Sequence, residues 1–369
     1  MNSPRIKFLA GLAFAAMCFM LGSATAPAAE TLRVMGWQGD VYIDHQQPFI
    51  DLVKEKHGID LKFEFTYAKN DDDFFAALRD GKADIVNPDH QIPKDERFNY
   101  IGRKLVLPLN LANIPNYRKL QTEFQNATFW TEGGQVYGVP TSYGFYGLAY
   151  NTKLLPEPPT TWNVLWDPKF KGKYVVGKAH YEPNAHVTAL ALGIPHEKLG
   201  DFKTLNTPKF RKKFDELAAN AKSFFEGVDQ ADDLQGLPVA AVWGVAFKEL
   251  AKRGENWRFA TPKEGSPAWI LTWLISSKLA EKPQMKTIAE EWLNYLLSDE
   301  IQQYNVRDMY VAPITQSVLS KLPPDEIAAF KSDDPTFFQK HGVLFPVLRE
   351  KDRTGFERLW DKALKQRKP

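Results

Sequence analysis

The sequence predicts an α/β protein with an open sheet, and three observations support this fold class. Between residues 32 and 86, patterns typical of strands and of helices alternate along the chain. The C-terminal third is largely helical in pattern. The chain without its leader, about 340 residues, is long enough to hold a fold by packing alone, normally as two domains.

Hydrophobic periodicity predicts the first elements. One apolar face, bounded by Pro48 and Gly58, indicates a helix, and the alternation of apolar and polar residues after it indicates a half-buried strand. Residues 71–73 are aspartates, which supply an N-cap and favourable charge for a second helix ending at Gly81. In chain order, we expect a strand at residues 32–35, a helix at 48–57, a strand at 59–67, a helix from 71 and a strand at 83–86.

A second domain is expected after the tyrosine- and glycine-rich segment 135–151. A proline-rich turn follows at residues 156–159, and such changes of composition mark domain boundaries. Beyond it, we expect strands at residues 174–176, 238–243 and 258–261, and helices at 185–192, 210–221, 286–297, 300–308, 325–331 and 347–365.

The N-terminal sequence predicts export. Arg5 and Lys7 precede an apolar stretch at residues 8–21, which is shorter than the ~20 residues of a membrane span, and small residues suited to cleavage follow. We therefore expect a signal peptide over residues 1–28 and a soluble protein in the periplasm. Cys18 is the one cysteine, and Met17 before it does not fit a lipoprotein signal.

The composition argues against several classes of function. The chain after the leader has no cysteine, so disulfides and thiolate metal sites are excluded. Two of the 47 basic residues lie in the leader, so the rest of the chain has as many basic as acidic residues, of which there are 45. A net charge near zero argues against a nucleic-acid partner. The histidines show no metal-ligand spacing, and no nucleophile elbow or phosphate-binding glycine loop occurs. We expect no metal, no cofactor and no catalytic residue.

Candidate ligand-binding residues stand at the ends of predicted strands. Trp37, Asp40 and His90 follow strands, and ligands of open α/β sheets bind at the carboxyl ends of strands. Trp243 and Trp269 lie where apolar runs meet loops, which is where binding groups concentrate. The alternative for both tryptophans is ordinary packing in the core.

Eight short blocks of sequence carry a resemblance to a known family. They are GWQGDVY at 36–42, GKADIV at 81–86, LPLNLANIPN at 107–116, YGVPTSYGFYGLAYNT at 137–152, TWNVLWDPKFKGK at 161–173, AAVWG at 240–244, PKEG at 262–265 followed by Trp269, and MYVAP at 309–313. Together they resemble the spermidine/putrescine-binding group of the bacterial extracellular solute-binding proteins of ABC importers. The block at 161–173 is the most specific, and the likeness spans essentially the whole chain after the leader.

The resemblance implies a two-lobed clamshell of the type II periplasmic binding proteins, each lobe an open mixed sheet flanked by helices. The N-terminal lobe would comprise residues 29–146 and 270–312, and the C-terminal lobe residues 147–269 and 313–369. A small organic solute, putrescine or spermidine by default, would bind in the cleft. Hinge closure would bury it, and the closed monomer would then dock on an ABC permease in the inner membrane.

The resemblance also implies which residues bind the solute. The expected set is an aromatic wall of Trp37, Trp243, Trp269 and Tyr310, with polar contacts from Asp40, His90 and Glu182. Two positions depart from the pattern, because Ala246 and Leu271 stand where polyamine binders place acids. Burying an ammonium group without a carboxylate costs several kcal/mol, and an aromatic face returns only ~0.5–2 kcal/mol.

Alternatives therefore remain open for the solute and for the class of protein. Within the same machinery, the solute is a polyamine, a ligand with one positive centre, a neutral molecule, or a carboxylate bound by Lys178 or His180. In a different class, a secreted hydrolase would use paired acids such as Asp40 and Glu182, but the sequence offers no other catalytic signature.

Overall fold

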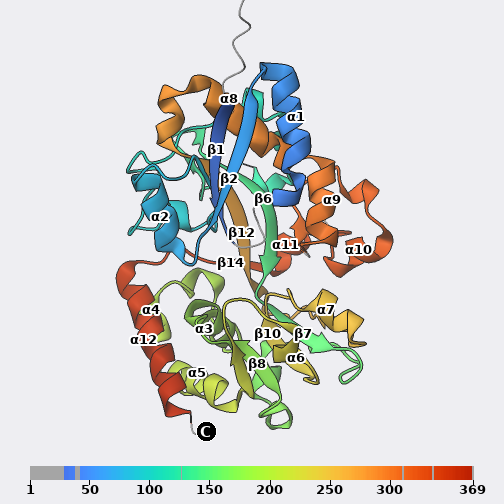
Figure 1. Cartoon of the computed structure of the whole chain (residues 1–369). Helices are drawn as coiled ribbons and strands as arrows, with labels where there is room; N and C mark the ends of the chain where they lie inside the picture. The colour runs from blue at the N-terminus through green and yellow to red at the C-terminus, as the bar shows by residue number, and fades with distance from the viewer. Residues whose placement is uncertain (1–28, 38–41, 126, 310, 335, 368–369) are drawn as a thin grey trace, which may run out of the picture.

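The computed structural model describes residues 29–367 except 38–41, 126, 310 and 335. Figure 1 shows two lobes, one above the other, each built around its own sheet. The first lobe contains a seven-stranded sheet in the order β13-β6-β12-β3-β1-β2, with β14 paired to β12. The second contains a five-stranded sheet in the order β11-β7-β10-β8-β9.

The strands of both sheets are short to medium in length. In the first sheet they are β1 (Ala29–Gly36), β2 (Asp60–Tyr67), β3 (Ile85–Val86), β6 (Gly138–Phe145), β12 (Ser266–Ile275), β13 (Ala312–Pro313) and β14 (Gly342–Leu344). In the second they are β7 (Gly147–Asn151), β8 (Tyr174–Gly177), β9 (Ser223–Phe225), β10 (Val239–Val242) and β11 (Trp257–Phe259). A separate hairpin joins β4 (Thr131–Glu132) to β5 (Gln135–Val136).

Both sheets are mixed. Strand β1 runs parallel to β2 and β3, whereas β12 runs antiparallel to β3 and β6. In the second sheet, β10 runs parallel to β8 and antiparallel to β7. The predicted α/β fold with two open mixed sheets is confirmed.

Helices flank both sheets (Figure 1). They are α1 (Gln46–His57), α2 (Asp71–Arg79), α3 (Tyr181–Leu190), α4 (Phe202–Leu205), α5 (Pro208–Asn220), α6 (Ala231–Leu234), α7 (Phe247–Lys252), α8 (Pro283–Leu296), α9 (Asp299–Arg307), α10 (Pro324–Ala329), α11 (Phe337–His341) and α12 (Glu350–Gln366). Gly58 forms the C-cap of helix α1, and its φ of 68° lies in the left-handed region that favours glycine.

The first turns of two helices differ from the prediction. Asn70 caps α2 by accepting a hydrogen bond from the amide of Asp73, so the aspartates that we expected to cap the helix form its first turn instead. Helix α3 begins at Tyr181, four residues before the predicted start at 185. Pro183 concealed this start, because proline breaks helix interiors but is tolerated in a first turn. Glu182 therefore lies on a helix and not on a loop.

Separate hydrophobic cores hold the two lobes. In the first lobe, Trp273 and Trp292 are fully buried, and in the second Trp162 and Trp360 are buried. The indole Nε1 of Trp162 donates a 2.7 Å hydrogen bond to the carbonyl of Gly265, in the segment that returns to the first lobe.

Within the described residues, the chain passes between the two sheets at three places. The first is the step from β6 to β7, the second the segment between β11 and β12, and the third the segment between β14 and α12. We predicted residues 313–369 for the C-terminal lobe. In the structure, β14 pairs with β12 of the first sheet, whereas α12 packs against α5 of the second lobe.

Candidate functional site

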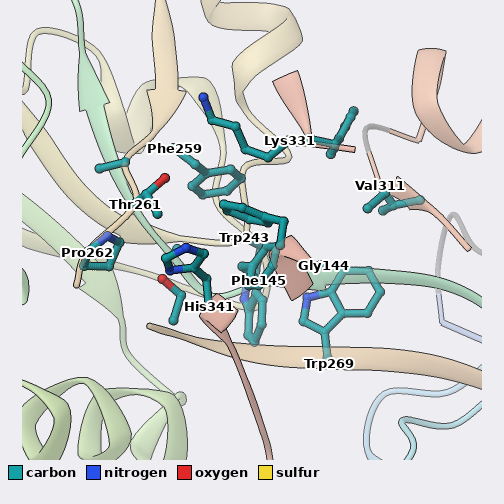
Figure 2. A pocket seen from close by; sticks show the side chains of 16 residues that line it. Gly144, Phe145, Trp243, Phe259, Thr261, Pro262, Trp269, Val311, Lys331 and His341 are labelled. Atoms are coloured by element: carbon teal, nitrogen blue, oxygen red, sulfur yellow. The ribbon is translucent and has the colours of Figure 1, made fainter. Parts of the chain in front are cut away.

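A pocket lies beside two of these passages, at the junction of the two lobes (Figure 2). It holds about 670 Å³ of space, including the part open to solvent. Its described lining is mainly aromatic and small: Gly144, Phe145, Gly147, Trp243, Phe259, Ala260, Thr261, Pro262, Ser266, Trp269, Val311, Ala312, Phe330, Lys331, Phe337 and His341. Such a lining, apolar with a few polar groups, is typical of sites for small organic ligands.

Two glycines make room for two of the rings. A Cβ atom on Gly144 would lie 2.4 Å from Cζ2 of Trp269, so the indole rests directly on the backbone of β6. In the same way, a Cβ atom on Gly147 would lie 2.4 Å from Cδ1 of Phe259. The Gly-Phe-Tyr-Gly sequence at the β6–β7 passage thus serves the pocket, because any larger residue at either glycine would displace an aromatic wall.

The loop that carries Trp243 is held by one buried carboxylate. Oδ1 of Asp229 accepts from the amides of Trp243 at 2.8 Å and Gly244 at 3.1 Å, and Oδ2 accepts from the amide of Ala246 at 3.0 Å. Burial raises the pKa of Asp229, and these three donors oppose that rise. Gly244 has a φ of 90°, so the turn after Trp243 suits glycine.

The indole of Trp243 is oriented by a histidine. Its Nε1 lies 3.1 Å from Nε2 of His180, and Tyr146 packs edge-on against it with ring centroids 4.9 Å apart. Burial lowers the pKa of His180 to about 4, so the ring is neutral at physiological pH and its Nε2 accepts the indole hydrogen.

Two other predicted residues lie apart from the pocket lining. Trp37 is half-buried and packs edge-on against Phe74 of α2, with ring centroids 5.0 Å apart. His90 is fully buried, where it accepts from the amide of Ile270 at 3.3 Å and donates to the carbonyl of Phe345 at 3.1 Å. Burial lowers its pKa to about 3, which keeps the ring neutral.

Glu182 belongs to a charged cluster between the lobes. Arg353 of α12 pairs with Asp95 of the first lobe, and Arg97 lies 3.7 Å from Asp71. The Oε1 atom of Glu182 and the Nη1 atom of Arg353 are buried without a hydrogen-bond partner in the described part of the chain. Burial raises the pKa of Glu182 to about 8 and that of Asp71 to about 6.

The remaining expectations fall in three groups. Asp40, Tyr310 and the predicted signal peptide over residues 1–28 lie outside the described residues. Lys178, considered as a carboxylate contact, forms an exposed ion pair with Glu226 at 2.6 Å. Trp243 and Trp269 both line the pocket, and their contact with a solute stays a prediction.

Sequence reasoning missed several lining residues, chiefly Phe259, Phe145 and Lys331. The glycines at 144 and 147 were an available signal, because glycines that flank aromatics in a strand often mark a close approach of another group. Lys331 gave no such signal.

No described helix is long and apolar enough to cross a membrane. The described residues also contain no cluster of three or more histidine, cysteine or acidic side chains suited to a metal ion.

Comparison with known proteins identifies the fold and a sequence family. The family model described as "Bacterial extracellular solute-binding protein" matches residues 80–335. A curated relative, the putrescine/agmatine-binding protein of Pseudomonas aeruginosa, is 25% identical over 217 residues, which are 52% of this chain and 55% of the relative. The matched part therefore spans about half the length of that relative.

Solved structures extend the likeness over nearly the whole chain. The spermidine/putrescine ABC transporter substrate-binding protein PotD of Streptococcus pneumoniae has a TM-score of 0.74 at 20% identity and covers 92% of this chain and 100% of its own. A putative spermidine/putrescine ABC transporter protein of Listeria monocytogenes gives 0.67 at 20% identity, covering 91% of this chain and 99% of its own. The structure titled Atu4243-GABA receptor gives 0.68 at 16% identity, covering 92% and 99%. At these identities the likeness concerns the fold.

Proposed function

Because the chain belongs to the family of bacterial extracellular solute-binding proteins, we propose that it captures a small organic solute in the aromatic pocket and delivers it to an ABC permease. We place the protein in the periplasm as a monomer, since a clamshell of this kind needs two free lobes and one surface for the permease. The match of the chain to this family confirms the prediction that it is not an enzyme, and the hydrolase hypothesis is dropped.

The placement of two tryptophans supports this proposal most strongly. Trp269 stands on β12 of the first lobe, whereas Trp243 follows β10 of the second, yet both rings line the same pocket. A solute held between them is held by both lobes, so its binding favours the conformation in which the lobes are together. This differential binding is what couples capture to hinge closure.

For the solute itself, we propose a small organic amine. The names of its relatives support putrescine, spermidine and agmatine as candidates. Among amines, the pocket favours those with few positive charges, because none of its described lining residues is acidic and one, Lys331, is basic. The two positions that depart from polyamine binders agree with this, since Ala246 and Leu271 are 3% and 4% exposed and offer no carboxylate.

A thermal-shift screen of the chain without residues 1–28 tests the proposal. The panel comprises amines, amino acids, sugars and organic acids. A ligand at 100 times its Kd adds about 2.7 kcal/mol to the apparent stability, so a true solute raises Tm by several degrees. Small-angle scattering with the best compound should then show compaction. A panel in which no compound raises Tm contradicts solute capture, and an unchanged radius at saturation contradicts hinge closure.

A further inference from the structure

Three described carboxylates near the pocket or its supporting loop form hydrogen bonds with other groups. Asp229 accepts from three backbone amides of the Trp243 loop. Glu264, between two lining residues, bonds with the hydroxyl of Thr161. Asp334 accepts from the amide of Thr336 at 2.8 Å and from Nζ of Lys340 at 3.1 Å. None of these acids is among the described lining residues of the pocket.

The charge of Lys331 is not committed in this way. It is the one Lys, Arg, Asp or Glu among the described lining residues, and it forms no ion pair with any residue in the described ranges. Its backbone has a φ of 55°, in the left-handed region that non-glycine residues rarely occupy. Figure 2 shows its side chain extended at the edge of the pocket that holds Phe259 and Trp243.

A strained backbone persists where the surroundings require it, and such positions concentrate at ligand sites. Here the strained residue, which is exposed, adds a positive charge to a lining whose other polar residues, Thr261, Ser266 and His341, include no carboxylate. A cationic solute would meet this like charge with no acid among the described lining residues to offset it. An anionic group would instead form a charge-assisted hydrogen bond, which is about twice as strong as a neutral one.

We propose that the solute carries an anionic group, a carboxylate in the simplest case, that binds the ammonium of Lys331 while the rest of the molecule packs on Trp243, Trp269 and Phe259. The inference rests on the proposed function and narrows its solute class from small organic amines to amines that also carry a carboxylate. An ammonium on the same molecule would be held by the aromatic faces through cation–π attraction.

Calorimetry with a matched four-carbon series tests the charge requirement. Putrescine carries two ammonium groups, γ-aminobutyrate one ammonium and one carboxylate, succinate two carboxylates, and butanediol no charge. These four probes are titrated together with every compound that raises Tm in the screen. The inference predicts that the tightest binder of the whole set carries a carboxylate and that putrescine binds at least about tenfold more weakly than γ-aminobutyrate.

Variants of Lys331 test the residue. Lys331→Met should lower the affinity for the tightest-binding carboxylate compound by about tenfold or more, because the carboxylate loses the ammonium group that it pairs with. Lys331→Arg should retain most of the affinity. Lys340→Met is the matched control, because Lys340 lies on the same segment but is not among the lining residues and pairs with Asp334. It should leave the affinity unchanged.

The results separate the inference from the proposed function. A tightest binder without any anionic group, or an affinity that Lys331→Met does not change, overturns the inference and leaves solute capture intact. A protein that binds no probe and no compound of the screen overturns the proposed function, and the inference falls with it.

Discussion

Nε1 of Trp243 donates a hydrogen bond to Nε2 of His180 over 3.1 Å, and this contact fixes the angle at which the indole faces the pocket. Because burial lowers the pKa of His180 to about 4, the acceptor stays available at physiological pH. The wall of the pocket is thus set by a residue that does not line it.

Replacing His180 with Phe should weaken solute binding by up to about tenfold, because a hydrogen bond of this kind contributes about 0.5–1.5 kcal/mol. His180→Gln should restore part of the loss, since a glutamine carbonyl can accept the same indole hydrogen. Calorimetry measures both, and His57→Phe in the distant helix α1 serves as the control. Equal affinity in the Phe and Gln variants would show that the bond does not orient the ring.

Gly144→Ala should reduce affinity while keeping every aromatic side chain. The added methyl group would lie 2.4 Å from Cζ2 of Trp269, so the indole must move away from β6. Gly58→Ala is the comparison, because it strains a φ of 68° at the end of α1 but touches nothing within 4 Å. Both variants should melt earlier than the wild type, and a loss of affinity in both or in neither would contradict the assignment of Trp269 to the site.

Asp229→Asn should lower both stability and affinity. Asparagine has nearly the same shape as aspartate, but its NH₂ group would face a backbone N–H donor. A buried donor left without an acceptor costs about 1–3 kcal/mol. The matched control is Asp233→Asn, since Asp233 accepts one hydrogen bond from the amide of Gln230 at an exposed helix end. For Asp229→Asn, the free energy of unfolding from chemical denaturation and the affinity from calorimetry should both fall. A normal affinity in a destabilised Asp229→Asn protein would show that the loop needs no carboxylate to present Trp243.

Stability should be greatest near pH 6.5 and should fall on both sides. His90, His180 and His186 have folded pKa values lowered to about 3, 4 and 3 by burial, so the unfolded chain takes up protons first as pH drops below 6.5. Burial raises the pKa of Glu182 from 4.5 to about 8, so the folded state holds a proton that the unfolded state has lost, and stability declines as pH rises to about 8. Asp71, with a pKa of about 6, acts in the same direction at lower pH.

Glu182→Gln should remove the decline between pH 6.5 and 8, because a glutamine cannot ionise. Melting temperatures across this range measure the effect, with exposed Glu249→Gln as the control. A wild-type Tm that stays level or rises from pH 6.5 to 8 would contradict the raised pKa of Glu182.

The sequence predicted the elements whose patterns are complete within a few residues. The alternation of apolar residues in β2 and the apolar face of α1 bounded by Gly58 required no tertiary information. The start of α3 was wrong because Pro183 reads as a helix breaker unless its place in the first turn is known.

The site was less accessible to prediction, for a physical reason. Phe259 was separable from core aromatics only through Gly147, which lies more than a hundred residues earlier in the chain. Lys331 reaches the pocket because its segment folds back beside β13 and α11, and no local pattern encodes that return.

Solute capture in this pocket is tested most directly by a calorimetric titration of the wild type and Trp243→Ala with the best compound from the thermal screen. We expect one solute per chain for the wild type and a loss of affinity of about tenfold or more in the variant, with stability largely kept. The opposite result, an unchanged affinity together with a loss of stability of about 3–5 kcal/mol, would make Trp243 a packing residue and contradict solute capture in this pocket.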